Sequence, residues 1–323
     1  MALILVGFNH RTAPVDMRER LSISSVDLPA ILSELHERYL SNTGRTRGNE
    51  AQTLATCESA ILSTCNRLEV YAVVHDVEHG WNTVETFLAR KGTISRDKLH
   101  EHLYLLAGHP VVEHLMQVTA GLDSMILGEP QIMGQVSEAF TRAQEARTSG
   151  TVLSHLFSAA LHAGKRAHTE TSISRYTTSV SHAAVQLMQK DIPDIERARI
   201  LLIGAGETAA LAAKALKMHN ARHITCVNRT QGRAESLAEQ IQGQALPWQA
   251  ISEALTEADI VLSTTSSPVP ILTFEMISRC MARREGRSLV MVDLAVPRDI
   301  ETSVAGLPGI KLYNIDHLQS VLD

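Results

Sequence analysis

The segment Leu201–Ala209 runs from an apolar strand through a glycine-rich turn into a helix, and it constrains the fold of this chain more than any other feature. Its pattern is G-x-G-x-x-A. The first glycine permits a tight turn, the second lets a pyrophosphate approach the backbone, and the small third residue lets helix and strand pack closely. Amide hydrogens and the dipole at the helix N-terminus attract phosphates. The pattern therefore predicts a dinucleotide site formed by Gly204, Ala205, Gly206, Glu207, Thr208 and Ala209.

Around this turn, short apolar runs alternate with segments that have room for helices. The runs are Ile200–Ile203, Ile224–Val227, Ile260–Ser263 and Leu289–Val292. Such an alternation indicates a parallel sheet with crossover helices. We therefore expect a Rossmann-type domain in the second half of the chain.

The second of these runs ends in Asn228-Arg229-Thr230, about where an NAD enzyme carries an acidic residue for the ribose hydroxyls. No carboxylate stands at this place in the sequence. A guanidinium and a hydroxyl suit a 2'-phosphate instead, so the sequence favours NADP over NAD. The alternative is that Arg229 is an ordinary surface arginine on a loop.

The N-terminal part has a different texture, with strands first and helices after them. The expected strands are Leu3–Gly7, Ala60–Thr64 and Glu69–Val74. We expect a helix at Leu28–Leu40 and an exposed polar loop at Ser41–Gln52. Apolar residues at three- and four-residue spacing predict packed helices in much of the stretch from Trp81 to about Lys190.

This organisation predicts an α/β protein of at least two domains, since a chain of 323 residues is too long for one ordinary core. We expect an α+β catalytic domain over residues 1–160. A Rossmann-type nucleotide-binding domain, with connecting helices at its start, is expected over residues 161–310. Residues 311–323 are expected to begin a C-terminal helix.

The charge of the chain argues against a protein that mainly coats nucleic acid. Its formal net charge is -5, whereas phosphate binding normally shows as a basic domain. A local nucleic-acid contact would have to come from small clusters such as Arg18 with Arg20 or Lys165 with Arg166. Each cluster reads more simply as the solvated face of a helix.

Membrane and metal sites are not expected either. No apolar run approaches the roughly 18 residues that span a bilayer, and the first residues lack a basic leader, so we expect a cytoplasmic protein. The cysteines are scattered, without zinc-ligand spacing, and are expected to be free thiols in a reducing compartment. They are Cys57, Cys65, Cys226 and Cys280.

Cys65 is expected at the tip of a tight connection between two strands, where reactive groups are often displayed. Thr64, Asn66 and Arg67 surround it with polar and cationic groups. Arg67 can lower the pKa of the thiol or bind a substrate carboxylate. The alternative is a structural thiol, an interpretation that fits the other three cysteines better.

A second polar segment, Gly121–Gln135, is rich in glycine and in hydrogen-bonding side chains, yet ordinary amphipathic helices flank it. Its polar groups need partners, and the ammonium and carboxylate of a small substrate would supply them. The candidate residues are Ser124, Glu129, Pro130, Gln131 and Gln135. The alternative is a helix N-terminus at Pro130 with Glu129 beside its dipole, which would leave Ser124 and the glutamines unexplained.

Four motifs in this order closely resemble the glutamyl-tRNA reductase family, whose members catalyse the first step of the five-carbon route to 5-aminolevulinate and tetrapyrroles. The motifs are Gly7–Pro14, Ser63–Glu69, Gly121–Gln135 and Asn228–Thr230. The resemblance runs from residue 3 to about residue 320.

The resemblance implies a thioester mechanism. Cys65 would attack the ester carbonyl that joins glutamate to tRNA, and NADPH would reduce the glutamyl thioester to glutamate-1-semialdehyde. A thioester suits this role because its carbonyl stays more electrophilic than that of an ester. By the same resemblance His114 supports activity, although its place on an amphipathic helix is otherwise typical of a core or boundary histidine. The implied substrate-recognition set is Thr64, Asn66, Arg67, Ser124, Glu129, Gln131 and Gln135.

The family also implies partners. These are glutamyl-tRNA(Glu), glutamate-1-semialdehyde aminomutase as the receiver of the aldehyde, and a second copy bound through a C-terminal helical dimerisation domain. We expect that domain to be absent or truncated here, because the sequence stops at Asp323. The polar stretch Ser41–Thr53 is expected to be a surface insertion relative to the family.

Two other functions fit the residues. One is an NADP-dependent acyl-thioester or aldehyde dehydrogenase that does not use tRNA. The other is a nucleotide-binding interaction protein without turnover.

Overall fold

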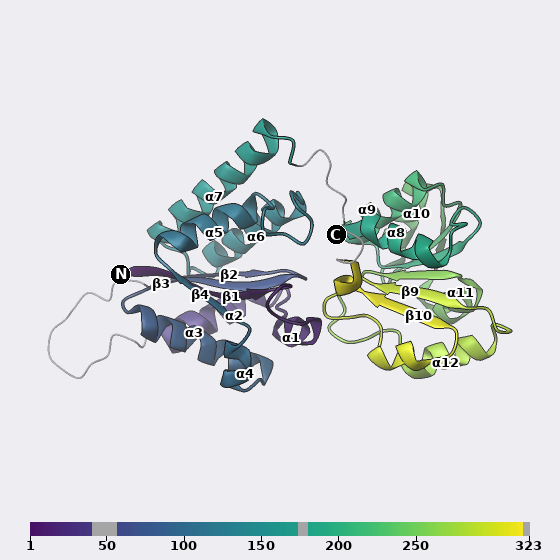
Figure 1. Ribbon diagram of the computed structural model, residues 1–323, viewed down its shortest axis with the longest axis horizontal. Helices are drawn as coiled ribbons and strands as arrows, with labels where there is room; N and C mark the ends of the chain where they lie inside the picture. Colours follow the sequence, from purple (N-terminus) through teal and green to yellow (C-terminus); the bar gives the residue numbers. More distant parts are fainter. Residues whose placement is uncertain (41–56, 174–179, 319–323) are drawn as a thin grey trace. The chain divides into compact units, whose positions relative to one another are not determined.

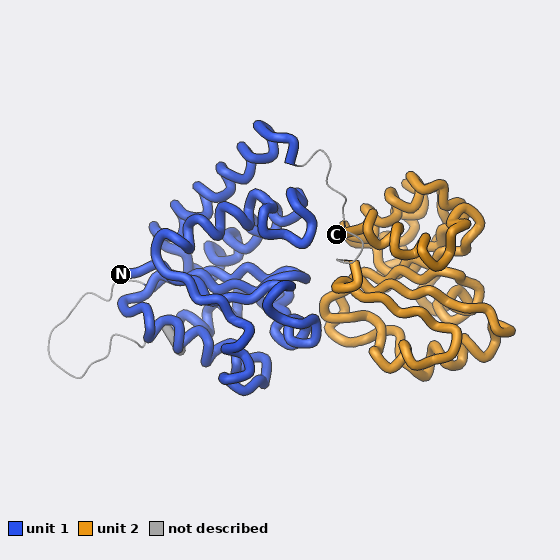
Figure 2. The backbone as a smooth tube through the Cα atoms, viewed as in Figure 1, with its two compact units in different colours: residues 1–177 blue, residues 178–323 orange. Residues whose placement is uncertain are grey.

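Two separate β-sheets organise the chain, one in each of two units, Met1–Thr177 and Thr178–Asp323 (Figure 1, Figure 2). The computed structural model describes residues 1–40, 57–173 and 180–318. The polar loop and insertion expected within Ser41–Thr53 lie outside the described residues, as does the end of the expected C-terminal helix.

The first unit contains an antiparallel sheet of order β2-β3-β1-β4. Its strands are β1 Ala2–Asn9, β2 Glu58–Ser63, β3 Arg67–Val74 and β4 Tyr104–Ala107. The first three confirm the predicted strands. β4 was not predicted, because a short apolar run within a helix-rich stretch carries no clear period. All residues of β3 are buried, since this interior strand has packing on both of its faces.

Helices cover the two faces of this sheet (Figure 1). On one side lie α1 Val15–Leu21, α3 Val77–Gly92 and α4 Arg96–His100. On the other side lie α5 His109–Thr119, α6 Gln131–Glu145 and α7 Thr151–Glu170. α2 Leu28–Glu34 contacts the edge strand β2 and α6. The helix expected at Leu28–Leu40 is α2 followed by a π-helical segment, Leu35–Leu40.

The second unit contains a parallel sheet of order β10-β9-β8-β5-β6-β7. Its strands are β5 Arg199–Ile203, β6 His223–Val227, β7 Gln244–Leu246, β8 Ile260–Ser263, β9 Leu289–Asp293 and β10 Ile310–Asn314. The four predicted strands and their parallel arrangement are confirmed. The edge strands β7 and β10 were not predicted, because they are partly exposed and lack a continuous apolar run.

Five helices surround this sheet in the described part of the unit. They are α8 Val180–Asp191, α9 Glu207–Met218, α10 Gln231–Ile241, α11 Ile251–Glu257 and α12 Phe274–Ala282. Side chains of α11 and α12 share a core with the face of the sheet that carries Leu201 and Val261. Short 3-10 turns follow at Trp248–Ala250, Thr302–Gly306 and Ile315–Leu318.

The expected domain boundary between residues 160 and 161 falls inside α7, which packs against α5 and α6 of the first unit. Because α7 packs on α5 and α6 as one continuous helix, it belongs to the first unit, and the two units divide further along the chain. The segment expected to begin a C-terminal helix starts instead with β10, and a 3-10 turn follows it.

Candidate functional site

Cys65 lies in the connection between β2 and β3, as the sequence predicts. The hydroxyl oxygen of Thr64 accepts hydrogen bonds from the amides of Asn66 and Arg67, at 3.2 and 3.1 Å. The amide of Thr64 donates to the carbonyl of Arg67 at 2.9 Å and closes the turn. Cys65 therefore stands at the tip of a fixed turn, half-buried, while the other three cysteines are buried.

Arg18 supports this turn from α1. Its guanidinium donates to the carbonyl of Cys65 at 2.7 Å, to Asn66 Oδ1 at 3.2 Å and to the carbonyl of Ala13 at 3.2 Å. The side chain is buried, so the interpretation of Arg18 as part of a solvated helix face is wrong. Helical spacing could not reveal this role, because the partners of Arg18 lie in a turn distant in the sequence.

Arg67 faces the interior of the first unit. Its Nη1 donates to Glu69 Oε1 at 2.7 Å and to Asp123 Oδ2 at 3.0 Å, and its Nη2 donates to the carbonyl of Asp123. The side chain is only 2% exposed. The structure thus differs from the expectation that Arg67 offers its guanidinium to a substrate carboxylate, because two acidic residues already hold it.

Glu69 is the centre of this buried network, with its side chain fully buried. Tyr71 and Tyr104 each donate a hydroxyl to its carboxylate at 2.6 Å, and His114 Nε2 lies 2.8 Å from Oε1. Gly7 pairs with Glu69 in the sheet, and a Cβ at Gly7 would lie 2.8 Å from Glu69 Cγ. A glycine is therefore required for Glu69 to reach these partners.

The pKa of the Glu69 carboxyl follows from these contacts. Burial alone would raise it, but the charge of Arg67 and the hydrogen bonds from His114 and Tyr104 outweigh burial and hold the pKa well below its ordinary value. Glu69 is therefore an anion that fixes the His114 ring. The sequence indicated His114 through the family resemblance, and it did not single out Glu69.

The Cys65 thiol itself is not activated in this structure. Burial, followed by the charge of Glu129, raises its pKa to about 11, and the opposing effects of Arg18 and Arg67 are smaller. Arg67 does lower the pKa of the Cys65 thiol, as expected, but its effect is too small to prevent a net increase. At neutral pH the group is a thiol in the absence of substrate.

The segment after α5 folds back toward this network. The amide of Gly128 donates to the carbonyl of Gly121 at 2.9 Å, and both glycines have positive φ, at 75° and 77°. Asp123 within this loop accepts from Arg67 and Arg11, both at 3.0 Å, and from Asn9 at 3.2 Å. Residues of the Gly7–Pro14 motif thus contact a carboxylate of the Gly121–Gln135 segment. The sequence did not predict this contact.

Of the predicted recognition residues, Ser124 lies within this loop, Glu129 and Pro130 lie at its end, and Gln131 and Gln135 lie in α6. Glu129 lies close enough to act electrostatically on Cys65. Pro130 is exposed at the N-cap of α6, and its helix begins with Gln131. Ser124, Gln131 and Gln135 are partly exposed and make no hydrogen bond through their side chains to other described residues.

His10 is a further residue of this region that the sequence did not mark. It directly follows β1, whose last residue, Asn9, pairs with Arg67. Its Nδ1 is buried and has no hydrogen-bond partner among the described residues. Burial, with the charges of Arg11, Arg67 and Arg18, lowers its pKa to about 4, so the ring is neutral at neutral pH.

The predicted nucleotide turn lies in the second unit, between β5 and α9. Gly204 has φ of +108°, and a Cβ there would lie 2.7 Å from Thr264 Oγ1, so the turn requires glycine. A Cβ at Gly206 would meet no atom within 4 Å, which leaves room for a ligand to approach the backbone. Glu207 begins α9, and Ala209 is fully buried against the sheet. The residues present therefore fit a bound pyrophosphate.

The predicted phosphate-recognition residues follow β6. Asn228 donates from its side chain to the carbonyl of Thr230 at 2.9 Å and so shapes the loop. Arg229 is exposed and forms no ion pair with any described residue. Both residues are suited to binding the 2'-phosphate of the cofactor, the role that the sequence predicts.

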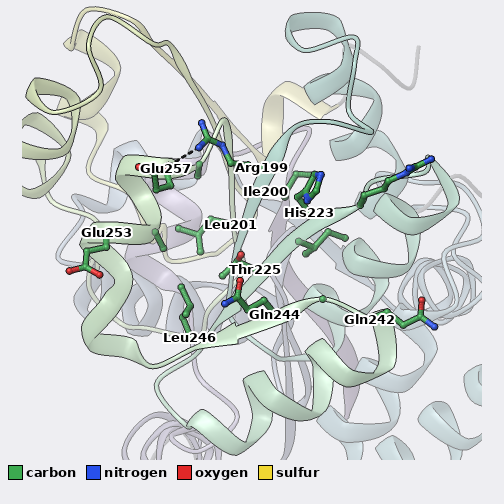
Figure 3. Close-up of a pocket in the computed structure, with 15 residues that line it drawn as sticks. Arg199, Ile200, Leu201, His223, Thr225, Gln242, Gln244, Leu246, Glu253 and Glu257 are labelled. Atoms are coloured by element: carbon green, nitrogen blue, oxygen red, sulfur yellow. Dashed lines mark hydrogen bonds and ion pairs between the residues drawn. The ribbon is translucent and has the colours of Figure 1, made fainter.

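A groove of about 560 Å³ lies elsewhere in this unit (Figure 3). It is lined by the starts of β5 and β6, by β7 and by α11, and Figure 3 shows Arg199 on its rim paired with Glu257. Since parallel strands bind nucleotides at their carboxyl ends, this groove is distinct from the predicted cofactor site.

The described residues, 1–40, 57–173 and 180–318, contain no candidate metal site. No three histidine, cysteine or acidic side chains among them lie close enough together to hold a metal ion. No helix of this part combines the length and the apolar character needed to cross a membrane.

Two family models match the two units. The model of the glutamyl-tRNAGlu reductase N-terminal domain matches residues 6–171. The model of shikimate/quinate 5-dehydrogenase matches residues 186–321. The first match covers about half of the chain and includes the Cys65 turn, the His114 helix and the Gly121–Gln135 segment.

Several glutamyl-tRNA reductases are similar to this chain along its whole length. A glutamyl-tRNA reductase of Geobacillus kaustophilus is 42% identical over 322 residues, which is 100% of this chain and 68% of that protein. One of Desulfitobacterium hafniense (strain Y51) is 39% identical over 320 residues, covering 99% of this chain and 69% of that protein. Among solved structures, glutamyl-tRNA reductase from Methanopyrus kandleri is 29% identical, with a TM-score of 0.46. The match covers 99% of this chain and 72% of the Methanopyrus chain.

Proposed function

The chain belongs to the glutamyl-tRNA reductase family, and we propose that Cys65 is the nucleophile with which it carries out that family's reaction. The chain is an NADPH-dependent oxidoreductase that converts glutamyl-tRNA(Glu) to glutamate-1-semialdehyde, at the start of tetrapyrrole synthesis. The observation that supports Cys65 most strongly is its turn. Thr64 and Arg18 fix the backbone on either side of this half-buried thiol, whereas the other cysteines are buried.

The first step is an acyl transfer to Cys65. The sulfur attacks the glutamyl ester carbonyl, a thioester forms, and the tRNA leaves with its hydroxyl. The thiol loses a proton and the leaving oxygen gains one, so the site must move a proton. His114 is suited to assist, because Glu69 fixes its ring and its side chain is 15% exposed.

Substrate binding is proposed to activate the thiol. Glu129 carries the charge that, after burial, most raises the pKa of Cys65. A substrate ammonium paired with Glu129 would cancel that charge and shift the equilibrium toward thiolate. The side chains of Ser124, Gln131 and Gln135 are proposed to bind the remaining polar groups of the glutamyl moiety, together with Thr64 and Asn66.

The cofactor is proposed to bind the second unit. Bound NADPH supplies a hydride to the acyl group. The turn from Gly204 to Ala209 would hold the pyrophosphate through backbone amides, and Arg229 and Thr230 would hold the 2'-phosphate. The open space at Gly206 supports this assignment, as does the exposed guanidinium of Arg229, which forms no ion pair with a described residue.

The partners follow from the same reaction. We propose that the aldehyde passes to glutamate-1-semialdehyde aminomutase, because a reactive aldehyde is best consumed directly. A homodimer and a cytoplasmic location are proposed by analogy with the family.

The proposed function is tested by following NADPH oxidation with two substrates, glutamyl-tRNA and a free glutamyl thioester. We expect oxidation with glutamyl-tRNA, its loss in Cys65→Ser, and its retention in the matched control Cys57→Ser. Oxidation with the thioester but not with glutamyl-tRNA would show that tRNA is not the substrate carrier and would favour an acyl-thioester dehydrogenase. No oxidation with either substrate would favour a nucleotide-binding protein without turnover.

A further inference from the structure

The cofactor turn of the second unit has a direct neighbour at the end of β8. The sheet register pairs Ile203 of β5 with Ser263 of β8, and the amide of Thr264 donates to the carbonyl of Ile203 at 2.9 Å. A Cβ on Gly204 would lie 2.7 Å from Thr264 Oγ1. The position of the segment Ser263–Thr265 therefore determines one wall of the turn.

A single buried carboxylate holds this segment at both ends. Oδ2 of Asp299 accepts from the hydroxyl of Ser263 and from the amide of Thr265, both at 2.7 Å. Oδ1 of Asp299 accepts from the hydroxyl of Thr265. Asp299 is 0% exposed. Its hydrogen bonds thus reach across from the loop after β9 to the end of β8.

A second buried carboxyl, Asp293, closes the loop that carries Asp299. Asp293 ends β9, and its carboxylate accepts from the amides of Ala295 and Ile300 at 3.0 and 2.8 Å. The side chain is 3% exposed. The loop therefore folds back on its own strand and places Asp299 beside β8.

The two carboxyls interact electrostatically. Burial, followed by the charge of Asp299, raises the pKa of Asp293 to about 7, and hydrogen bonds from loop amides offset this only in part. Its neighbours in the sheet are neutral, Ser263 of β8 and Asn314 of β10.

Helix α8 also packs on β9, and its titratable side chains are His182, Lys190 and Asp191. Asp191 is paired with Lys311 and Tyr313. The loop itself carries one more charged side chain, Arg298, next to Asp299. Near neutral pH the Asp293 carboxyl therefore exchanges its proton beside the charge of Asp299.

We propose that Asp299, supported by Asp293, is a positioning residue for the nicotinamide half of the cofactor. A dinucleotide lies across the carboxyl ends of the strands at the point where the strand order reverses, here between β5 and β8. Arg229 follows β6 and marks the adenosine half, so the nicotinamide half lies over β8 and β9. The inference rests on the proposed function in taking the Gly204 turn as the NADPH site.

The experiment measures NADPH affinity by cofactor fluorescence in Asp299→Ala and Asp299→Asn. Alanine removes the acceptor for both ends of the segment, so NADPH should bind at least about tenfold more weakly. Asparagine should retain near wild-type affinity at pH 6, because the hydroxyls of Ser263 and Thr265 can donate or accept. Asp259→Asn is the matched control, since Asp259 precedes β8 at the opposite edge and pairs with Arg199.

A pH series adds a measurement that a purely structural role would not change. As pH rises through 7, the second carboxyl ionises beneath an anionic ligand, so the affinity of the wild type should fall severalfold between pH 6 and 8.5. Asp299→Asn removes the charge that opposes ionisation of Asp293, and its affinity should vary less in this range. Asp259→Asn should follow the wild type.

Each outcome decides the inference. Wild-type affinity in Asp299→Ala, or an unchanged pH profile in Asp299→Asn, overturns it while leaving the proposed function intact. If the alanine variant does not fold by circular dichroism, the pH profile of the asparagine variant decides alone. A wild type that does not bind NADPH overturns both the cofactor assignment and this inference.

Discussion

The proposed reactive edges of the two units are built from different groups. Around Cys65, the first unit uses buried charged side chains, with Arg67 held between Glu69 and Asp123. At the cofactor turn, the second unit uses backbone amides and small residues such as Gly206. Acyl transfer needs side chains with defined charge, whereas a pyrophosphate can be bound by amides at a helix N-terminus.

Two buried carboxyls show what this difference does to acidity. Glu69 and Asp293 are both buried, yet the pKa of Glu69 lies below its ordinary value and that of Asp293 is raised to about 7. Burial raises the pKa in both cases. At Glu69 the charge of Arg67 together with the hydrogen bonds from His114 and Tyr104 outweighs burial, while at Asp293 a second carboxyl adds to the effect of burial. The neighbour rather than burial therefore decides the direction.

The largest effect is expected from Glu69→Gln. Removing the anion leaves the Arg67 guanidinium buried with less compensation, so the free energy of unfolding should fall by about 3 kcal/mol. Urea denaturation at pH 7 measures it. Glu85→Gln is the control, because the partners of Glu85, Arg96 and His100, are substantially exposed, and it should cost clearly less. An equal loss in both variants would contradict the special role of the buried network.

The pH dependence of the same contribution has a defined sign. Because the folded-state pKa of Glu69 is lowered, its stabilisation is present above the ordinary carboxyl value of 4.5 and is lost as the pH falls through its folded-state pKa. The stability difference between wild type and Glu69→Gln should therefore shrink in acid. A difference that grew in acid would show that Glu69 is not held as an anion.

Arg229→Ala should act on the cofactor and not on the fold. Loss of a charge-assisted contact to the 2'-phosphate should weaken NADPH by about tenfold to a hundredfold while NADH changes little. Fluorescence titration with both cofactors measures this. Arg222→Ala, another exposed arginine of the unit that pairs with Glu196, should alter neither affinity. Equal losses for NADPH and NADH would refute the role of Arg229.

Gly206→Ala should weaken NADPH by about tenfold, because the added methyl occupies the space where the pyrophosphate approaches the backbone. The fold should tolerate it within about 0.5 kcal/mol, since no described atom lies in the way. Gly232→Ala is the control. A Cβ at Gly232 would be equally unhindered, but this residue lies in α10 and outside the Gly204–Ala209 turn. Unchanged NADPH affinity in Gly206→Ala would place the pyrophosphate elsewhere.

The smallest effect is expected from Glu129→Gln. Removing its charge lowers the pKa of the Cys65 thiol, so alkylation by iodoacetamide at pH 8 should become faster by about severalfold. Glu138→Gln, an exposed position on α6, should leave the rate unchanged. Slower alkylation in Glu129→Gln would exclude the proposed activation by substrate.

The contrast between the two edges also explains what the sequence could predict. The conformation of the turn from Gly204 to Ala209 was predictable from the sequence, because it depends on local backbone geometry. The turn around Cys65 was predictable as a loop between strands. Its electrostatics were not, because Arg18, Glu69 and Asp123 meet it only after distant segments pack together.

The same reason accounts for the fold. Buried strands such as β5 and β8 have continuous apolar runs and were predicted. The edge strand β10 is partly exposed and reads as an irregular segment. The hydrophobic pattern thus locates elements whose burial is complete, while partly exposed strands depend on pairing that a sequence does not display.

The central claim is that the sulfur of Cys65 carries the glutamyl group before reduction, and acylation without cofactor tests it most directly. The protein is mixed with glutamyl-tRNA in the absence of NADPH, quenched in acid and examined by peptide mass spectrometry. The account predicts a glutamyl adduct on the peptide that contains Cys65, and none in Cys65→Ser. An adduct on another residue, or reduction that proceeds in Cys65→Ser, would contradict it.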